Sequence, residues 1–300
     1  MLLNDYLIFI VILASFGNAF VILSLLINQK TRTTFGVFII NIAFIDFLIG
    51  AFLKSSFVVE DYFEGQQISG MHCYLMTSFI TASPMIKIMI MIVLSLFTLF
   101  GSIKKISLDK LLTPENTFVT LLLIWILCGG MSLINHRVLG KHSSSCAVDE
   151  ELLIISVFAI FLLMGLLIAI HVIIIVIEQV RKVNDTIEMM RTDGVYNNLS
   201  VELQREEEEA QMNDKSSKRL IFIISLLFVL FWMPFYSIRA HYEFNDKKHT
   251  FDLVIFQLIA YVFGYFNSTV TPIAILVVYP ESRILLNKVD WEKFKFWKKF

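Results

Sequence analysis

The sequence predicts an all-α fold: a seven-transmembrane helix bundle with a short amphipathic cytoplasmic helix after the seventh span. Three observations support this prediction. Hydrophobic residues make up 57% of the 300 residues and the mean hydropathy is +0.72, far above an ordinary globular domain. Seven apolar stretches approach or exceed the length of about 20 residues that a helix needs to cross a bilayer. Finally, Lys and Arg are distributed unevenly between alternate loops.

The seven stretches are separated by short polar segments. They lie near residues 6–27, 36–58, 73–103, 118–135, 152–178, 219–240 and 252–279. The first stretch lacks a basic start and a small-residue cleavage site, so we expect it to remain as a membrane helix. No internal repeat is visible, which argues against a transporter built from inverted halves. Residues 1–280 are therefore predicted to form one membrane domain.

The charged loops predict the orientation of this domain. The first, third and fifth loops and the C-terminal tail hold 18 Lys and Arg residues, whereas the opposite side holds five. Because positively charged loops remain in the cytoplasm, we expect an extracellular N-terminus and a cytoplasmic C-terminus. The sequence therefore predicts a multi-pass protein of the plasma membrane, with the lipid bilayer around it.

The three cysteines differ in their expected roles. Cys73 lies at the outer end of the third span and Cys146 in the second outer loop. That compartment is oxidising, so we predict a disulfide between them. Cys128 lies within the fourth span and is expected to be a buried, small apolar residue.

Two polar segments have distinct compositions. The third cytoplasmic loop, about residues 179–218, contains the acidic run 206–209 and shows no core-forming period. We interpret it as a solvated or locally helical extension, with a partner-binding role as the alternative. The tail, residues 281–300, mixes Trp and Phe with Lys, so we expect an amphipathic helix along the inner membrane surface.

One acidic residue and three prolines interrupt the apolar spans. Asp46 lies in the middle of the second span, where a carboxylate costs roughly 2.5–3.5 kcal/mol, so it must face the interior of the bundle. Pro84, Pro234 and Pro272 each remove a backbone hydrogen bond. Trp232 lies beside Pro234 and can wedge against its neighbours there. The bend is either a hinge or a merely structural kink.

Taken together, these landmarks resemble the rhodopsin-like (class A) G-protein-coupled receptors. The similar motifs are Gly17-Asn18, Asn41 to Asp46, Cys73, Trp125, Phe228 to Phe235, Asn267-Ser268, Thr271-Pro272 and Tyr279 to Arg283. The spacing of the first four also resembles the family's, and the likeness covers nearly the whole chain. It implies a receptor that binds an extracellular small molecule or peptide and contacts a heterotrimeric G protein at the cytoplasmic face.

The ligand site is expected at the outer mouth of the bundle. Parts of the chain resemble receptors for biogenic amines, which hold an ammonium group with an aspartate seven residues after Cys73; here that residue is Ile80. Amine binding in that mode is therefore not expected. Arg239 instead favours an acceptor or anionic ligand group, unless its side chain faces solvent. The expected ligand-binding residues are Ile80, Ser83, Trp232, Phe235, Tyr236, Arg239 and Tyr265, under the second outer loop.

Three cytoplasmic switch elements depart from the family's pattern. Phe97-Thr98-Leu99 stands where the family has Asp-Arg-Tyr, and Thr271-Pro272-Ile273-Ala274-Ile275 replaces Asn-Pro-x-x-Tyr. The fifth span has no proline, although His171 stands near the place of another switching tyrosine. Coupling through the usual contacts is therefore not expected at Thr98. The remaining hinge or switch residues are Trp232, Pro234 and Pro272.

The resemblance also predicts a buried ion pair. The family's counterpart of Asp46 binds sodium together with a serine of the third span, and Lys87 stands at that serine's position. Lys87 and Asp46 would each be costly alone in a membrane but neutralise each other as a pair. We therefore expect a permanent salt bridge that replaces the sodium site, with Asn267 and Ser268 as hydrogen-bond partners. The alternative is that Lys87 reaches towards water.

Three other functions are alternatives to a signalling receptor. A homologue that does not couple to G proteins would act as a decoy or dimer partner. A transporter or channel could use Asp46 and Lys87 as an ion relay, but the chain has only one such pair. An intramembrane enzyme is disfavoured because the chain has no His-Glu-x-x-His motif. No cofactor, metal or nucleic acid is expected.

Overall fold

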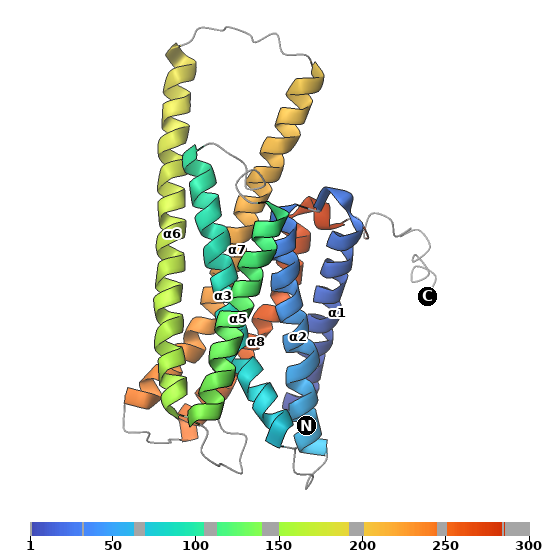
Figure 1. The fold of residues 1–300 in the computed structure, drawn as a ribbon, viewed down its shortest axis with the longest axis vertical. Helices are drawn as coiled ribbons and strands as arrows, with labels where there is room; N and C mark the ends of the chain where they lie inside the picture. The colour runs from blue at the N-terminus through green and yellow to red at the C-terminus, as the bar shows by residue number, and fades with distance from the viewer. Residues whose placement is uncertain are drawn as a thin grey trace.

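The computed structural model describes residues 2–31, 33–62, 70–104, 113–139, 150–191, 201–244, 251–283 and 285. Within these ranges the chain forms seven α-helices and two short 3-10 turns, and the predicted all-α, seven-helix fold is confirmed (Figure 1). The elements are α1 (Leu2–Ile27), η1 (Gln29–Thr31), α2 (Thr34–Tyr62), α3 (Gly70–Lys104), α5 (Pro114–Leu139), α6 (Glu150–Arg191), α7 (Val201–Phe244), α8 (Phe251–Val278) and η2 (Pro280–Arg283). The seven α-helices correspond in order to the seven predicted spans.

Helix α3 is the central element of the bundle. It packs against α2, α5, α6 and α7, while α8 packs against α1, α2 and α7. Apolar side chains from these helices form one continuous core in which Phe38, Ile86 and Phe228 are almost fully buried. In this arrangement α2 packs against both α3 and α8.

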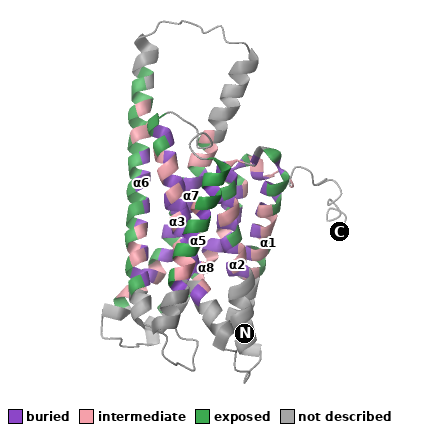
Figure 2. Ribbon diagram, viewed as in Figure 1, coloured by how far each residue is buried: buried purple, intermediate pink, exposed green. Residues whose placement is uncertain are grey.

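The outer surface of the bundle is strongly apolar. Large hydrophobic side chains such as Phe118 and Leu162 are exposed along α5 and α6 (Figure 2). Four helical stretches of the described residues have the length and hydropathy to cross a membrane, and three shorter apolar stretches accompany them. An exposed apolar surface of this extent matches a bundle surrounded by lipid tails.

Helices α6 and α7 are longer than the predicted spans. Most of residues 179–218, interpreted as a loop, are helical, since α6 continues to Arg191 and α7 begins at Val201. Both helices project beyond the rest of the bundle (Figure 1). The added segments contain no proline or glycine and are rich in strong helix formers. This outcome agrees with the locally helical interpretation of the segment.

A polar joint connects the ends of α1 and α8. Asn28 Nδ2 donates to the carbonyl of Glu281 at 2.8 Å, and Ser282 Oγ donates to the carbonyl of Tyr279 at 2.6 Å. The ring of Tyr279 packs edge-on against Phe35, with centroids 5.4 Å apart. Most of the predicted tail helix, residues 281–300, lies outside the described residues, which end at 285, as do Cys146 and the side chain of Cys73. The tail helix and the disulfide therefore stay predictions.

Glycine at position 50 permits the close approach of α1 and α2. A Cβ atom on Gly50 would lie 2.6 Å from Ser15 Oγ and 3.0 Å from the Ser15 backbone nitrogen. A backbone atom cannot move aside without shifting α1. By contrast, a Cβ atom on Gly165 of α6 would meet no heavy atom within 4 Å.

We predict that Gly50→Ala lowers the stability of the purified protein by about 1–3 kcal/mol, because the added methyl group overpacks the α1–α2 contact. Gly165→Ala is the matched control, and it should leave the melting temperature unchanged or raise it, since alanine has the higher helix propensity. Thermal unfolding of the two variants in the same detergent measures the difference. Equal melting temperatures would contradict this packing.

Candidate functional site

Lys87 and Asp46 form a buried ion pair between α3 and α2. Lys87 Nζ lies 2.7 Å from Asp46 Oδ2 and 2.8 Å from Oδ1. The two side chains are only 2% and 0% exposed. The structure thus brings together the two charges that the sequence places in different spans.

Helix α8 supplies the other partners of this pair. Asn267 Oδ1 accepts from Lys87 Nζ at 2.7 Å, and Thr271 Oγ1 accepts at 3.3 Å. Ser268 Oγ donates to Asp46 Oδ1 at 2.8 Å. Sequence reasoning proposed Asn267 and Ser268 but missed Thr271 as a partner of Lys87. Its spacing of four residues from Asn267 places both on one helix face, which was the available signal.

These contacts explain how the charges can be buried. An ammonium group has three protons to donate, and here carboxylate, amide and hydroxyl oxygens surround Lys87 Nζ. The Asn267 amide must present its oxygen to Lys87, because its NH₂ group cannot accept from an ammonium. Lys87 Nζ also lies 5.9 Å from the centroid of the Phe228 ring on α7. The cluster is therefore formed by α2, α3 and α8, and it also contacts α7.

The expected ligand-binding aromatics gather around Trp232 of α7. The Trp232 ring lies 6.0 Å from Phe235, 5.7 Å from Tyr236 and 5.6 Å from Tyr265 of α8, measured between centroids. Phe228 lies 6.3 Å from Trp232 on the opposite side, towards Lys87. Ser83 of α3 is buried, and the side chains of Ile80 and Arg239 lie outside the described residues.

The two prolines of the expected hinge lie within continuous helices. Pro234 is inside α7 and Pro272 is inside α8. Gly264 faces Trp232, since a Cβ atom there would lie 3.1 Å from the indole ring. Gly17 of α1 similarly faces the Pro272 ring at 3.0 Å. Small residues thus allow close packing at both places.

Thr98 lies near the C-terminal end of α3 and carries no charge. Thr98 Oγ1 donates to the carbonyl of Leu94 in its own helix at 2.8 Å. One turn earlier, Ser95 Oγ lies 3.3 Å from His171 Nε2 of α6, and the His171 ring packs edge-on against Phe222 of α7. A contact between α3, α6 and α7 therefore lies one turn from Thr98.

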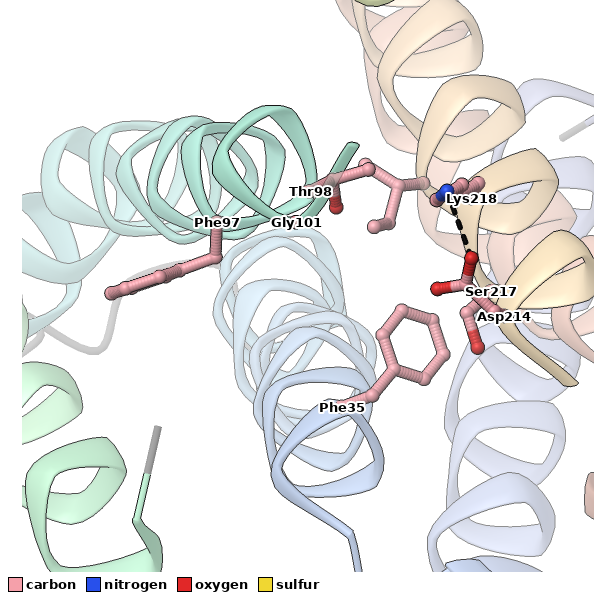
Figure 3. A pocket seen from close by; sticks show the side chains of 8 residues that line it. Phe35, Phe97, Thr98, Gly101, Asp214, Ser217 and Lys218 are labelled. Atoms are coloured by element: carbon pink, nitrogen blue, oxygen red, sulfur yellow. Dashed lines mark ion pairs between the residues drawn. The ribbon is translucent and has the colours of Figure 1, made fainter. Parts of the chain in front are cut away.

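A small pocket, with a cavity volume of about 10 Å³, opens at the same end of the bundle. Figure 3 shows its wall, which combines apolar, hydroxyl and charged side chains: Phe35, Phe97, Thr98, Gly101, Asp214, Ser217, Lys218 and Ile221. Lys218 Nζ lies 2.8 Å from Asp214 Oδ2 and 3.4 Å from Glu178 Oε1 of α6. The charges of this pocket come from α7, because α2 and α3 contribute only uncharged residues to it.

Comparison with known proteins identifies relatives of the chain. A family model described as "7 transmembrane receptor (rhodopsin family)" matches residues 17–274. The Allatostatin-A receptor of Bombyx mori is 23% identical over 292 residues, which cover 94% of this chain and 77% of that protein. The Trissin receptor of Drosophila melanogaster is 25% identical over 151 residues, covering 46% of this chain and 22% of that protein.

We predict that Asp46 and Lys87 are energetically coupled. Asp46→Asn or Lys87→Met alone should destabilise the protein by about 3–5 kcal/mol, since each leaves an unpaired buried charge. The double variant buries no charge and should be more stable than the sum of the two losses predicts. Unfolding of the four proteins measures the coupling free energy. Strictly additive losses would show that the two residues do not interact.

Proposed function

The chain belongs to the rhodopsin family of seven-transmembrane receptors, and on that basis we propose that it binds an extracellular ligand and signals across the plasma membrane. In this proposal the Lys87 ammonium group is a permanent cation at the centre of the bundle. In this proposal the N-terminus is extracellular and the C-terminus cytoplasmic, as the Lys and Arg distribution predicts. The predicted disulfide between Cys73 and Cys146 would hold the second outer loop over the ligand site. The family match favours a receptor over the transporter alternative.

One observation carries this proposal: a line of ring contacts connects the expected ligand site with the buried ion pair of Lys87 and Asp46, which we call the polar centre. Tyr265 contacts Trp232, Trp232 contacts Phe228, and Lys87 Nζ lies over Phe228. A ligand that displaces Trp232 therefore acts on the side chain that packs against the buried cation. Such packed contacts are bistable rather than continuously deformable, which suits a switch between two arrangements.

The ligand is proposed to bind without the ammonium anchor of amine receptors. Ile80 offers no carboxylate, and the rings of Trp232, Phe235, Tyr236 and Tyr265 provide an apolar, π-rich surface. Arg239 would add a donor for an acceptor or anionic group. A small molecule or peptide with an aromatic or aliphatic group and no obligatory ammonium fits this set.

The polar centre is proposed to need no sodium ion. Lys87 places an ammonium group against both carboxylate oxygens of Asp46, so a second cation beside it would be repelled. Because this ammonium group is covalently attached to α3 through the Lys87 side chain, the cation stays in place in every state of the receptor. Any rearrangement must therefore take place around the ion pair rather than by loss of an ion.

Coupling is proposed to use contacts other than an arginine at position 98. The Thr98 hydroxyl bonds to its own helix, and Ile275 is fully buried where the family has a tyrosine. The family implies G-protein coupling in general, so a G protein is the first partner to test. A homologue that binds ligand without coupling is the second candidate, and the neutral Thr98 is the observation that favours it.

We predict that sodium does not specifically stabilise this protein. The melting temperature should respond equally to sodium chloride and choline chloride at equal concentration. In Lys87→Ser the tethered ammonium is gone and a hydroxyl faces Asp46, so sodium should now stabilise the variant in proportion to its occupancy. A sodium-specific gain in the unmodified protein, as large as in the variant, would contradict the proposed replacement.

A thermal-shift screen tests the ligand proposal. We predict that a member of a panel containing allatostatin-A, trissin, small acids and amines stabilises the purified protein by about 2.7 kcal/mol at 100 times its dissociation constant. Phe235→Ala should remove this gain, whereas Leu162→Ala on the exposed face of α6 should keep it. A gain that survives Phe235→Ala would place the ligand elsewhere.

Nucleotide exchange on purified G proteins then separates the two candidate functions. A coupling receptor should accelerate exchange when the stabilising ligand is bound. Exchange by Thr98→Arg but not by the unmodified protein would instead favour the non-coupling homologue.

A further inference from the structure

The pocket beside Thr98 carries a charged contact that the roles above do not use. We propose that Lys218 is a positioning residue: through Glu178 it holds the inner part of α7 against α6 and so sets the resting width of this pocket. The inference rests on the proposed signalling function only for its biological consequence, because the geometry can be tested without ligand or G protein.

Lys218 is shared by two carboxylates that play different parts. Asp214 lies four residues earlier on the same helix, so its 2.8 Å contact with Lys218 braces α7 internally. Glu178 belongs to α6, so its 3.4 Å contact with Lys218 crosses between helices. Only the second contact can restrain α7 relative to another helix. Asp214 serves to orient the Lys218 ammonium beside Glu178.

The bridge lies at the wall of the pocket, because Lys218 itself lines it. Asp214, Ser217, Lys218 and Ile221 line the pocket from α7 (Figure 3). They form two successive turns of one helix face, opposite the uncharged wall that α3 provides. A movement of these turns relative to α3 changes the pocket directly. Between α3 and α7, the described residues show no ion pair that could resist such a movement.

The bridge is partly exposed, which sets the size and the salt dependence of its effect. The side chains of Lys218 and Glu178 are 21% and 38% exposed. Exposed pairs shift an equilibrium only a few-fold, and added salt screens them. The buried pair of Lys87 and Asp46 is screened much less. Ionic strength should therefore act on the inner pocket while leaving the polar centre unchanged.

Distances between spin labels on α3 and α7 test the proposal. The labels would be placed at Ile103→Cys and Lys215→Cys, both exposed positions, in the full chain carrying Cys128→Ala in lipid nanodiscs. Electron double-resonance measurements at low salt report the distance distribution. Lys218→Met and Glu178→Gln should each enlarge the minor distance populations roughly two- to fivefold. This is the change in an equilibrium that a partly exposed ion pair typically produces.

Matched variants separate the bridge from general charge effects. Arg219→Met removes the exposed positive charge next to Lys218 and should change nothing. Lys218→Arg keeps the charge and should retain the narrow distribution. Asp214→Asn should broaden the distribution less than Glu178→Gln, because it leaves the contact between helices intact. A high concentration of either sodium chloride or choline chloride should broaden the distance distribution of the unmodified protein. It should not further broaden the distribution of Lys218→Met.

An unchanged distribution in both Lys218→Met and Glu178→Gln at low salt, with normal melting temperatures, would overturn the proposal. A larger effect of Asp214→Asn than of Glu178→Gln would also overturn it. Neither result would bear on ligand binding or nucleotide exchange, so failure of this bridge is distinguishable from failure of the receptor function. Conversely, a receptor that never activates a G protein could still show the predicted distances.

Discussion

The ion pair between Lys87 and Asp46 is the interaction on which the centre of this bundle depends. Neither charge could be buried alone, because no water or opposite charge would compensate it. Their hydrogen bonds to Asn267, Ser268 and Thr271 extend the pair to α8. Three helices must therefore meet in one register, and small residues such as Gly50 and Gly264 let the neighbouring helices close around them.

Two lysines form ion pairs at different places in the bundle. At the centre, a lysine of α3 fills the place where the resemblance implies a sodium ion. At the pocket beside Thr98, Lys218 of α7 provides the cation, whereas α3 contributes only uncharged residues to the wall. In both places the cation is a lysine side chain held by carboxylates of its own helix or of a neighbouring helix.

The sequence predicted the helices from hydropathy, and it predicted the buried pair from the cost of charges in lipid together with the resemblance to the receptor family. It underestimated α6 and α7, since hydropathy detects only the part of a helix that crosses the membrane, and residues 179–191 are helical but polar. Thr271 was interpreted as a lost motif rather than as a partner of Lys87. The pocket beside Thr98 could not be predicted, because α2, α3 and α7 form it together.

A dipolar recoupling measurement between lysine ¹⁵Nζ and aspartate ¹³Cγ tests the buried pair most directly. The sample would be the full chain in membranes, labelled at these two atoms. We predict a short-range signal of which one part disappears in Lys87→Ser while the part from Lys218 and Asp214 remains. A signal unchanged by Lys87→Ser would show that the Lys87 ammonium does not lie against Asp46, and would contradict this account of the bundle centre.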